Sequence, residues 1–443
     1  MHAPESAYNA KSRCIEWKLE IFFDGMSQEP LVITRNDYLI TSEVLEEASA
    51  SSNTPWGNVS ANELSATLRN DNDIFNPHNE ESPYFNKIKV GTPVKAYSRP
   101  TIVSDTPYEW DPLGIFYVAD WVTRSGGLSV EITCFDRVRD VLGAERVKMK
   151  VLRNVSKKNL IQAFFDQLSV PVVIDNTFED ILIYGYHTKG NKDFLNNVSA
   201  GMNAWIFCDH AGHIQVRYMR HSLQVAHTIT DNDQIIDISS QQGISLDYDG
   251  IQLYLKVPQL SESREILSVR NLIVPATPLE VTSQMFTKQP VADVLYAKLT
   301  LPCNALVTWH NATSIDFDYR ITNYDHAPGS SILTFYGRIV ETADTVVTSG
   351  GRNLLKLDNI YVQTQEQFES IRRFLLSWVS GVPPLLEVSV RGNPQFELGQ
   401  KIRVVSSRFN TDFEGVLVRQ NLKYNGGLSG TITLMNSRIL EVV

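Results

Sequence analysis

Metal-type ligands gather most densely in the middle of the chain. A short segment there holds Cys208, His210, His213 and His221. Thiolate and imidazole groups with a Cys-x-His-x-x-His spacing can bind zinc when they converge on one point. The same segment contains Asp209-His210-Ala211-Gly212, a turn-type sequence between two apolar runs, which predicts a β-hairpin. Because a hairpin turn exposes His210 and alternation separates the other side chains, we favour a structural hairpin over a zinc site.

A second candidate is a calcium site in the first third of the chain. Asp71, Asp73 and Asn76 would supply the oxygen ligands that Ca²⁺ prefers. The segment lacks the glycine and the terminal glutamate of an EF-hand loop, however. We therefore expect residues 70–73, Asn-Asp-Asn-Asp, to form a turn through Asx-type hydrogen bonds to their own backbone.

Trp110 marks a candidate carbohydrate site, because three carboxylates surround it in the sequence: Asp105, Glu109 and Asp111. An aromatic ring can stack on a sugar, and carboxylates beside it can accept hydrogen bonds from the sugar hydroxyls. A solvated loop tip anchored by one tryptophan explains the same residues, and we favour that interpretation. No pair among the 50 acidic residues is singled out for glycoside hydrolysis.

Signatures of the common catalytic and nucleotide-binding sites are missing from the sequence. It contains no G-x-S-x-G, no H-E-x-x-H, no G-x-x-x-x-G-K-[ST] and no G-x-G-x-x-G. We therefore predict no catalytic residues, no metal ligands and no cofactor, and we expect that the chain is not an enzyme.

The composition is that of a folded protein with an acidic balance. The 443 residues, 43% hydrophobic and 20% charged, suffice for several domains with buried cores. A net charge of −10 without a cluster of Lys and Arg argues against sequence-specific binding of DNA or RNA. An acidic wall would instead repel a polyanion that passes along it.

Cysteine usage and hydropathy indicate the compartment in which the chain folds. Its four cysteines have no short spacing: Cys14, Cys134, Cys208 and Cys303. We expect them to be small buried residues of a protein assembled in a reducing cytoplasm. Residues 1–11 lack an apolar signal sequence, and no stretch approaches eighteen apolar residues, so we expect neither a signal peptide nor membrane insertion.

Periodicity changes along the chain. The first third alternates as strands, for example over 17–23 and 63–68, which suits a small antiparallel barrel closed on itself. From about residue 150 we expect a helix capped by Ser156, a second helix over about 192–202, and then the hairpin of residues 204–219.

The last two hundred residues return to strands, with one well-marked helix. Residues 245–248 and 251–255 are the clearest strands, and 304–348 has the aromatic, polar composition of a β-rich insertion. Thr364 and Gln367 form a capping box that begins a helix, which Gly381 and two prolines end. Its apolar face is formed by Phe368, Ile371, Leu375 and Trp378.

One β-unit occurs twice, some three hundred residues apart. A strand, a connection, a second strand, a Gly-Gly turn and a third strand follow in the same order in both halves. The matched segments are 90–96 with 398–404, 116–122 with 416–422, and 126–133 with 426–433. An internal duplication of this kind points to a role in symmetry rather than to a single catalytic site.

One segment is specific enough to indicate a family. Residues 68–84, LRNDNDIFNPHNEESPY, lead to the sequence VGTPV over 90–94. This resembles a pattern near the N-terminus of bacteriophage tail hub proteins, the central proteins of the baseplate or tail tip. The resemblance continues through 114–118 and 135–137, and again through 357–359 and 396–404.

Two features depart from the family pattern. Ile74 stands where the family usually has a glycine, which puts the turn at Asp73-Ile74 in doubt. We also expect no lysozyme or peptidase domain, such as larger relatives carry, after the second barrel, because the sequence ends at Val443 soon after it. The residues themselves predict a turn followed by a proline-extended arm, with Phe75 and Tyr84 as anchors against a core.

The resemblance implies a trimer in which each chain supplies two barrels to a ring of six. Such a ring matches a six-fold tail tube on one side and a three-fold tip on the other. We therefore expect a homotrimeric structural virion protein that contacts the tail tube or distal tail ring and the tip, spike or baseplate proteins. DNA would pass transiently and non-specifically through its channel. The expected location is the virion tail, after assembly in the host cytoplasm.

The predicted fold is mainly β with an α+β middle: two related antiparallel β-barrels, a small α+β domain and a β-rich insertion. The expected units are a first barrel over 1–149, an α+β domain over 150–232, strands of the second barrel over 233–300, an insertion over 301–350, and a helix with the second barrel over 351–443. Two alternatives stay open from the sequence. One is a tail protein that degrades or binds cell-envelope glycans, and the other is the hub of a non-viral contractile injection system.

Overall fold

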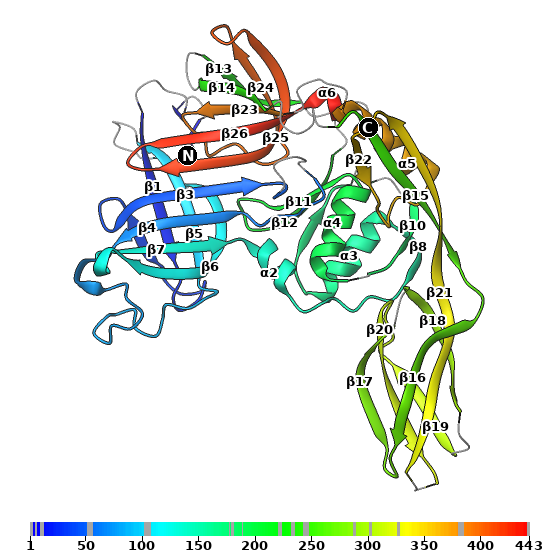
Figure 1. The fold of residues 1–443 in the computed structure, drawn as a ribbon. Coiled ribbons are helices and arrows are strands. Elements are labelled where there is room, and N and C mark those ends of the chain that lie inside the picture. Colours follow the sequence, from blue (N-terminus) through cyan, green and yellow to red (C-terminus); the bar gives the residue numbers. More distant parts are fainter. Residues whose placement is uncertain are drawn as a thin grey trace.

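The computed structural model describes most of the chain. The described residues are 3–4, 7–8, 13–50, 56–101, 108–176, 178, 181–187, 189–219, 224–231, 235–241, 248–286, 289–300, 304–325, 328–379 and 385–440. Several predicted features lie outside them: Asp105, His221, Cys303, residues 245–247 and the helix terminators Gly381, Pro383 and Pro384. The expected fold class is confirmed, because strands dominate and helices concentrate in the middle of the chain (Figure 1).

The first barrel is a strongly curved antiparallel sheet of seven strands in the order β2-β1-β5-β6-β7-β4-β3. Alternate side chains of its strands are buried in one core, as the period of two predicts. The strands are β1 (Cys14–Ile21), β2 (Leu31–Thr34), β3 (Leu39–Glu47), β4 (Glu63–Arg69), β5 (Pro93–Thr101), β6 (Asp111–Arg124) and β7 (Ser129–Phe135). The two end strands, β2 and β3, do not pair with each other among the described residues. The prediction that this sheet closes on itself is therefore wrong.

The second barrel has the strand order β13-β24-β25-β26-β23-β14. Its strands are β13 (Val225–Thr230), β14 (Ile235–Gln241), β23 (Leu385–Val390), β24 (Lys401–Ser406), β25 (Thr411–Tyr424) and β26 (Leu428–Asn436). One pair, β13 with β24, is parallel, which corrects the expectation of a purely antiparallel barrel. β13 can pair in parallel with β24 because the chain enters β13 from the α+β domain and not through a hairpin turn.

The duplicated unit is present in both barrels. β5, β6 and β7 correspond to β24, β25 and β26, and both sets pair in the same antiparallel order. The Gly91 N–H donates to the Val118 carbonyl at 2.7 Å, and the Gly399 N–H donates to the Leu417 carbonyl at 2.8 Å. Both glycines have positive φ, 85° and 81°, and both middle strands bulge at this point. Val118 is therefore equivalent to Leu417, one residue away from the alignment suggested by sequence.

A helix follows the third strand of the unit in both halves: α2 (Arg137–Gly143) and α6 (Ser437–Leu440). The carboxylate of Asp136 accepts the Val138 N–H at 2.9 Å, and the side-chain oxygen of Asn436 accepts the Arg438 N–H at 3.0 Å. The duplication thus extends to the helix cap, beyond the segments that the sequence matched.

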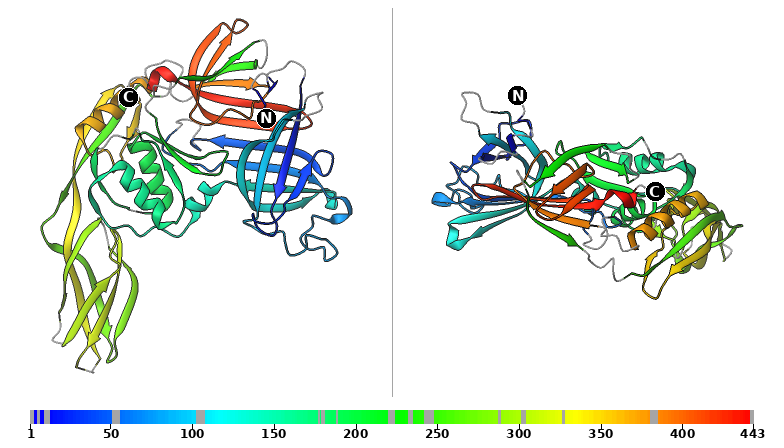
Figure 2. Two further views of the ribbon diagram at one scale, coloured as in Figure 1. Left: turned by 180° about the vertical axis from the view of Figure 1, so that it is seen from behind. Right: turned by 90° about the horizontal axis from the view of Figure 1, so that it is seen from above.

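The α+β domain agrees with its predicted helices and hairpin. α3 (Lys157–Gln167) is capped by Ser156, whose hydroxyl accepts the Asn159 N–H. α4 (Asn191–Gly201) leads to the hairpin of β11 (Ala204–Cys208) and β12 (Ile214–Tyr218). The remaining strands are β8 (Leu152–Ser156), β9 (Val172–Ile174) and β10 (Leu182–Gly185). Figure 2 shows this domain between the barrels and a projecting β-unit.

The projection is built around β21 (Gly329–Gly350), which takes part in two sheets. Its first half pairs with β16 and β18, and its second half pairs with β15. A second sheet, β17-β20-β19, packs against the first half around a shared apolar core. The other elements here are β15 (Gly250–Leu260), β16 (Arg264–Val274), β17 (Leu279–Met285), β18 (Val291–Leu299), β19 (Ala305–His310), β20 (Asp316–Asn323) and β22 (Leu354–Leu357).

Sheet membership differs from the predicted units in two places. Of the described strands within 233–300, which were predicted to join the second barrel, only β14 does so, whereas β15 to β18 belong to the projection and its base. The insertion therefore begins before residue 301. β13, predicted within the α+β unit, also belongs to the second barrel. Local alternation identifies strands but does not specify their partners, which explains these errors.

The predicted helix near the C-terminal end is α5 (Gln365–Val379). The Thr364 hydroxyl accepts the Gln367 N–H at 3.3 Å, as the capping box requires. The Gln367 side chain instead bonds to Gln363 and to the Gly201 carbonyl, so it ties the helix to the α+β domain. All four predicted apolar-face residues of this helix are buried.

Candidate functional site, the junction between the barrels

One continuous sheet runs through both barrels, because β25 is shared between them. Along one edge β25 pairs with β26. Along the other edge its first part, 411–416, pairs with β24, and its last part, 419–424, pairs with β3 of the first barrel. The change of partner occurs at the bulge beside Leu417. The bulge therefore lets one strand serve two barrels.

Apolar side chains of the second barrel fill the open side of the first barrel. Leu422 and Tyr424 of β25, with Leu428 of β26, are buried in the core of the first barrel. The Tyr424 ring stacks on Trp17, with ring centroids 5.7 Å apart and planes 20° apart. Burial of three large apolar side chains makes this an obligate contact within the chain.

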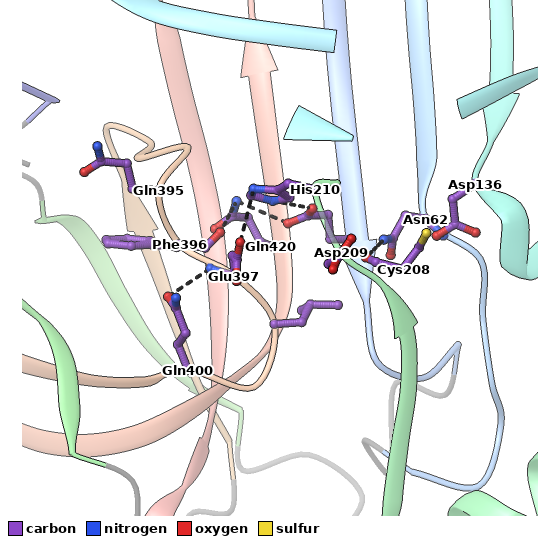
Figure 3. Close-up of polar contacts among 12 residues, drawn as sticks. Asn62, Asp136, Cys208, Asp209, His210, Gln395, Phe396, Glu397, Gln400 and Gln420 are labelled. Atoms are coloured by element: carbon purple, nitrogen blue, oxygen red, sulfur yellow. Dashed lines mark hydrogen bonds and ion pairs between the residues drawn. The ribbon is translucent and has the colours of Figure 1, made fainter. Parts of the chain in front are cut away.

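A buried polar cluster lies at the centre of the junction (Figure 3). His210, at the tip of the β11–β12 hairpin, places its Nε2 2.8 Å from Glu46 Oε1 and its Nδ1 3.9 Å from Glu397 Oε1. Gln420 of β25 donates to Glu46 Oε2 and to the Phe396 carbonyl, both at 3.4 Å. The cluster joins both barrels to the α+β domain.

The prediction that His210 is exposed is wrong: its side chain is buried, with 8% relative exposure. The hairpin turn itself is confirmed, because the Gly212 N–H donates to the Asp209 carbonyl at 2.9 Å. The turn is buried because it docks between the two barrels. Glu46 gives the sequence signal for this contact, since it follows Ser42 and Val44 on the inward face of β3.

The electrostatics of the junction favour a charged pair. Burial alone lowers the pKa of His210, but the charge and hydrogen bond of Glu46 and the charges of Glu397 and Asp209 outweigh it. The net pKa of His210 is about 9. A protonated histidine therefore neutralises Glu46, which would otherwise be a buried carboxylate without a cation.

Asn62 extends the cluster toward the first barrel. Its side-chain amide donates to the Cys208 carbonyl at 3.1 Å, and its backbone N–H donates to Asp136 Oδ2 at 3.0 Å. Burial raises the pKa of Asp136 to about 7, although N–H groups of Asn62, Val138 and Arg139 oppose the shift. The carboxylate that caps α2 is thus tied to the hairpin of the α+β domain.

The zinc candidates that the structure describes, Cys208, His210 and His213, do not converge on one point. Burial raises the pKa of the Cys208 thiol, and His210 is engaged by Glu46. His213 is exposed, with Nδ1 3.6 Å from Asp209 Oδ2. Across the part of the chain that the structure describes, no three His, Cys, Asp or Glu side chains form a metal-type group. Cys14 is exposed, which corrects the expectation that all the cysteines are buried.

The acidic segment of the calcium candidate forms a turn. Asp73 Oδ1 and Oδ2 accept the side-chain amides of Asn70 and Asn76 at 3.0 and 2.8 Å, and Asp71 pairs with Arg69. Positive φ falls on Asn72 and Asp73, whereas Ile74 has φ −69°, so this turn does not require a glycine at position 74. Phe75 and Tyr84 anchor the arm as predicted, with stacked rings 5.6 Å apart.

Two cations of the same barrel lie over the ring of Trp110. Lys18 Nζ lies 4.9 Å and the Arg99 guanidinium 4.2 Å from the ring centroid. Asp111 is buried and accepts the Tyr8 hydroxyl at 2.6 Å. These contacts favour an anchored loop over a carbohydrate platform.

The continuous sheet has one exposed face, and acids outnumber bases on it. In the central strands of the sheet, from β14 to residues 120–124 of β6, the carboxylates that cross-strand pairing places on this face are Glu43, Glu47, Glu63, Asp120, Glu131, Asp237 and Glu387. The cations of these central strands are Arg69, Arg124, Arg419 and Lys423, and each lies within 4 Å of a carboxylate. Burial and the charges of Glu43 and Glu47 raise the pKa of Glu63, which shows how closely these acids gather.

The fold is that of phage tail proteins. No family model and no curated protein match the sequence. The 43 kDa tail protein of prophage MuSo2 from Shewanella oneidensis is similar to this chain, with 12% identity, 96% of this chain and 99% of that chain covered, and a TM-score of 0.53. A tail protein from Neisseria meningitidis MC58 matches with 7% identity, 97% and 98% coverage, and a TM-score of 0.53. The class of fold implied by the sequence resemblance is confirmed.

Proposed function

We propose that this chain is a structural tail protein, the hub that joins the six-fold tail tube of a phage to the tail tip or baseplate. Three copies would form a ring of six barrels. The observation that carries the proposal is the pair of equivalent barrels, joined as one sheet through β3 and β25. Two quasi-equivalent units per chain allow three chains to present six similar surfaces to a hexamer.

The exposed face of the continuous sheet would line the channel through which DNA passes. In its central strands, from β14 to residues 120–124 of β6, Ser and Thr side chains alternate with acids, and the four cations are paired with carboxylates. Over these central strands the described residues offer no unpaired cation to the phosphates, so DNA would slide rather than bind.

The α+β domain and the projection would contact neighbouring tip, spike or baseplate proteins at the periphery of the ring. In this proposal the chain assembles in the host cytoplasm, functions in the virion tail and catalyses no reaction. No helix within the described residues has the length and apolarity to cross a membrane.

The test is the mass of the purified chain by light scattering, combined with class averages from electron microscopy. A mass of about three times 50.0 kDa and a ring with six lobes and an open centre would support the hub. A compact dimer, or a trimer without a central opening, would contradict it.

A further inference from the structure

The two barrels share more than the unit detected in the sequence. β4 and β3 of the first barrel correspond to β23 and β14 of the second, because β4 pairs with β7 as β23 pairs with β26. The correspondence includes a bulge: the register shifts between Leu39 and Thr41 in β3, and between Ile235 and Asp237 in β14. β14 is therefore the second-barrel equivalent of β3.

This equivalence exposes an asymmetry between the barrels. In the second barrel, residues 419–424 of β25 pair with β3. The equivalent residues of β6, 120–124, pair with β7 on one edge, and no strand pairs with their other edge in the described part of the chain. The Trp121 N–H bonds to the side chain of its own neighbour Asp120 at 2.9 Å. β14 likewise pairs only with β23 there.

The turn leucines show the same asymmetry. Leu428 is 9% exposed, because it packs against the first barrel beside Trp17 and Tyr424. Its equivalent Leu128 is 73% exposed. A leucine that is buried where the neighbouring barrel is present, and exposed where none is present, marks an unfilled interface.

We propose that residues 120–124 of β6 pair with β14 of a second copy of this chain, repeating between chains the contact that β25 and β3 make within one. The occupant is another copy, rather than a different protein, because the chain already contains both halves of this contact. The pairing rests on the proposed hub, and names the surfaces by which its subunits join. Each chain offers one β6 edge and one β14 edge, so the contacts are head-to-tail, and three of them would close the ring of the proposed hub.

The internal contact fixes the register of the proposed one. Within the chain, Lys423 lies opposite Glu43 and Asn421 lies opposite Leu45. By equivalence, Arg124 of one copy lies opposite Ser239 of the next, and Val122 lies opposite Gln241. Asp237 is two residues from Ser239 on the same face of β14, where its carboxylate is within diagonal reach of Arg124.

The pairing can be tested with a disulfide across the proposed register. Arg124→Cys and Ser239→Cys are introduced together in the full chain, with Cys14 and Cys303 replaced by serine. Directly opposed residues of paired strands have the Cα separation that a disulfide needs. We expect oxidation to give bands of two and three chain masses on a non-reducing gel, which reductant reverses, while each single variant stays at one chain mass.

Two control pairs accompany this variant. Lys423→Cys with Glu43→Cys should cross-link within one chain, because those residues are paired in the structure. Arg124→Cys with Asp237→Cys is two residues out of register and should cross-link several-fold less. Equal cross-linking of the two intermolecular pairs would contradict the register.

Light scattering of the same samples separates the two proposals. A three-chain particle without cross-links would overturn the strand pairing and leave the hub standing. Cross-links in a particle that is not trimeric would support the pairing and overturn the hub. A monomer without cross-links at high concentration would contradict both.

Discussion

The two barrels carry the same five-strand arrangement, yet they differ in how their edges are satisfied. The second barrel pairs its long strand with the first barrel and buries Leu428 in that contact. Within the part of the chain that the structure describes, no strand pairs with the equivalent edge of the first barrel, and Leu128 is exposed. In our account, the duplicated chain contains the same interface twice. One copy is already formed between β25 and β3, and the equivalent copy at β6 is still open. Single substitutions at equivalent positions should therefore act on folding in one barrel and on assembly in the other.

The largest difference is expected at an inward position of the shared strand. Leu422 is buried in the first barrel, so Leu422→Ala should lower the free energy of unfolding by about 2–5 kcal/mol. Its equivalent Thr123 is exposed, and Thr123→Ala should change it by less than about 0.5 kcal/mol. Denaturant titrations of the two variants at low protein concentration measure this. Equal effects would show that the barrels are not equivalent in the proposed way.

The charged pair at the junction predicts a pH dependence. The folded chain holds a proton on His210 up to about pH 9, whereas the unfolded chain releases it near pH 6.5. The folded state therefore binds more protons between these values, and the free energy of unfolding should fall by on the order of 3 kcal/mol as the pH rises through them.

His210→Gln should remove this slope and destabilise the chain at pH 6, because Glu46 loses its cation. Denaturation midpoints between pH 5 and pH 9.5 measure both effects. The Asp136 carboxyl, whose pKa is about 7, is common to both chains, so the difference between them isolates His210. A slope unchanged by the substitution would mean that His210 is neutral in the folded chain.

The turn leucines offer a matched pair for assembly. Leu128→Ser should leave the stability of the single chain unchanged and weaken association about tenfold or more, because an exposed leucine becomes buried only between chains. Leu428→Ser should instead lower the stability of the chain itself by about 2–3 kcal/mol. Sedimentation of a concentration series and thermal unfolding separate these effects. Normal assembly of the Leu128→Ser variant would argue against burial of this turn.

The smallest effect is expected on the exposed face of the sheet. Glu63→Lys with Glu131→Lys should make the assembled ring retain short duplex DNA, with an affinity that falls steeply with salt. Glu262→Lys with Glu280→Lys adds the same charge to exposed positions in the projection and should have much less effect. Fluorescence anisotropy at several salt concentrations measures the difference. If the unsubstituted ring already binds DNA tightly, the face does not line a channel for sliding.

Local features of this structure could be predicted from the sequence, because they depend on neighbouring residues. The Gly-Gly turns, the helix that Ser156 caps and the hairpin at Asp209 all follow from backbone preferences and period. The order of landmarks in the two halves also revealed the duplication. The structure then showed that the duplication includes equivalent bulges at Val118 and Leu417 and the hydrogen bonds that they accept from Gly91 and Gly399. No sequence pattern indicates these features.

Tertiary partners could not be predicted in the same way. The burial of His210 depends on Glu46 and Glu397, which are far away in sequence and meet only when the hairpin docks. The 22-residue strand β21 changes partners midway, and nothing in its alternation signals the change. The parallel pairing of β13 with β24 likewise depends on where the α+β domain delivers the chain.

The most direct test of the equivalence between the barrels is an electron microscopy reconstruction of the assembled particle at a resolution that separates strands. We predict one continuous sheet that crosses all the barrels, with β14 of each chain beside residues 120–124 of β6 in the next. Chains that meet through other surfaces, with both of these edges open to solvent, would contradict it.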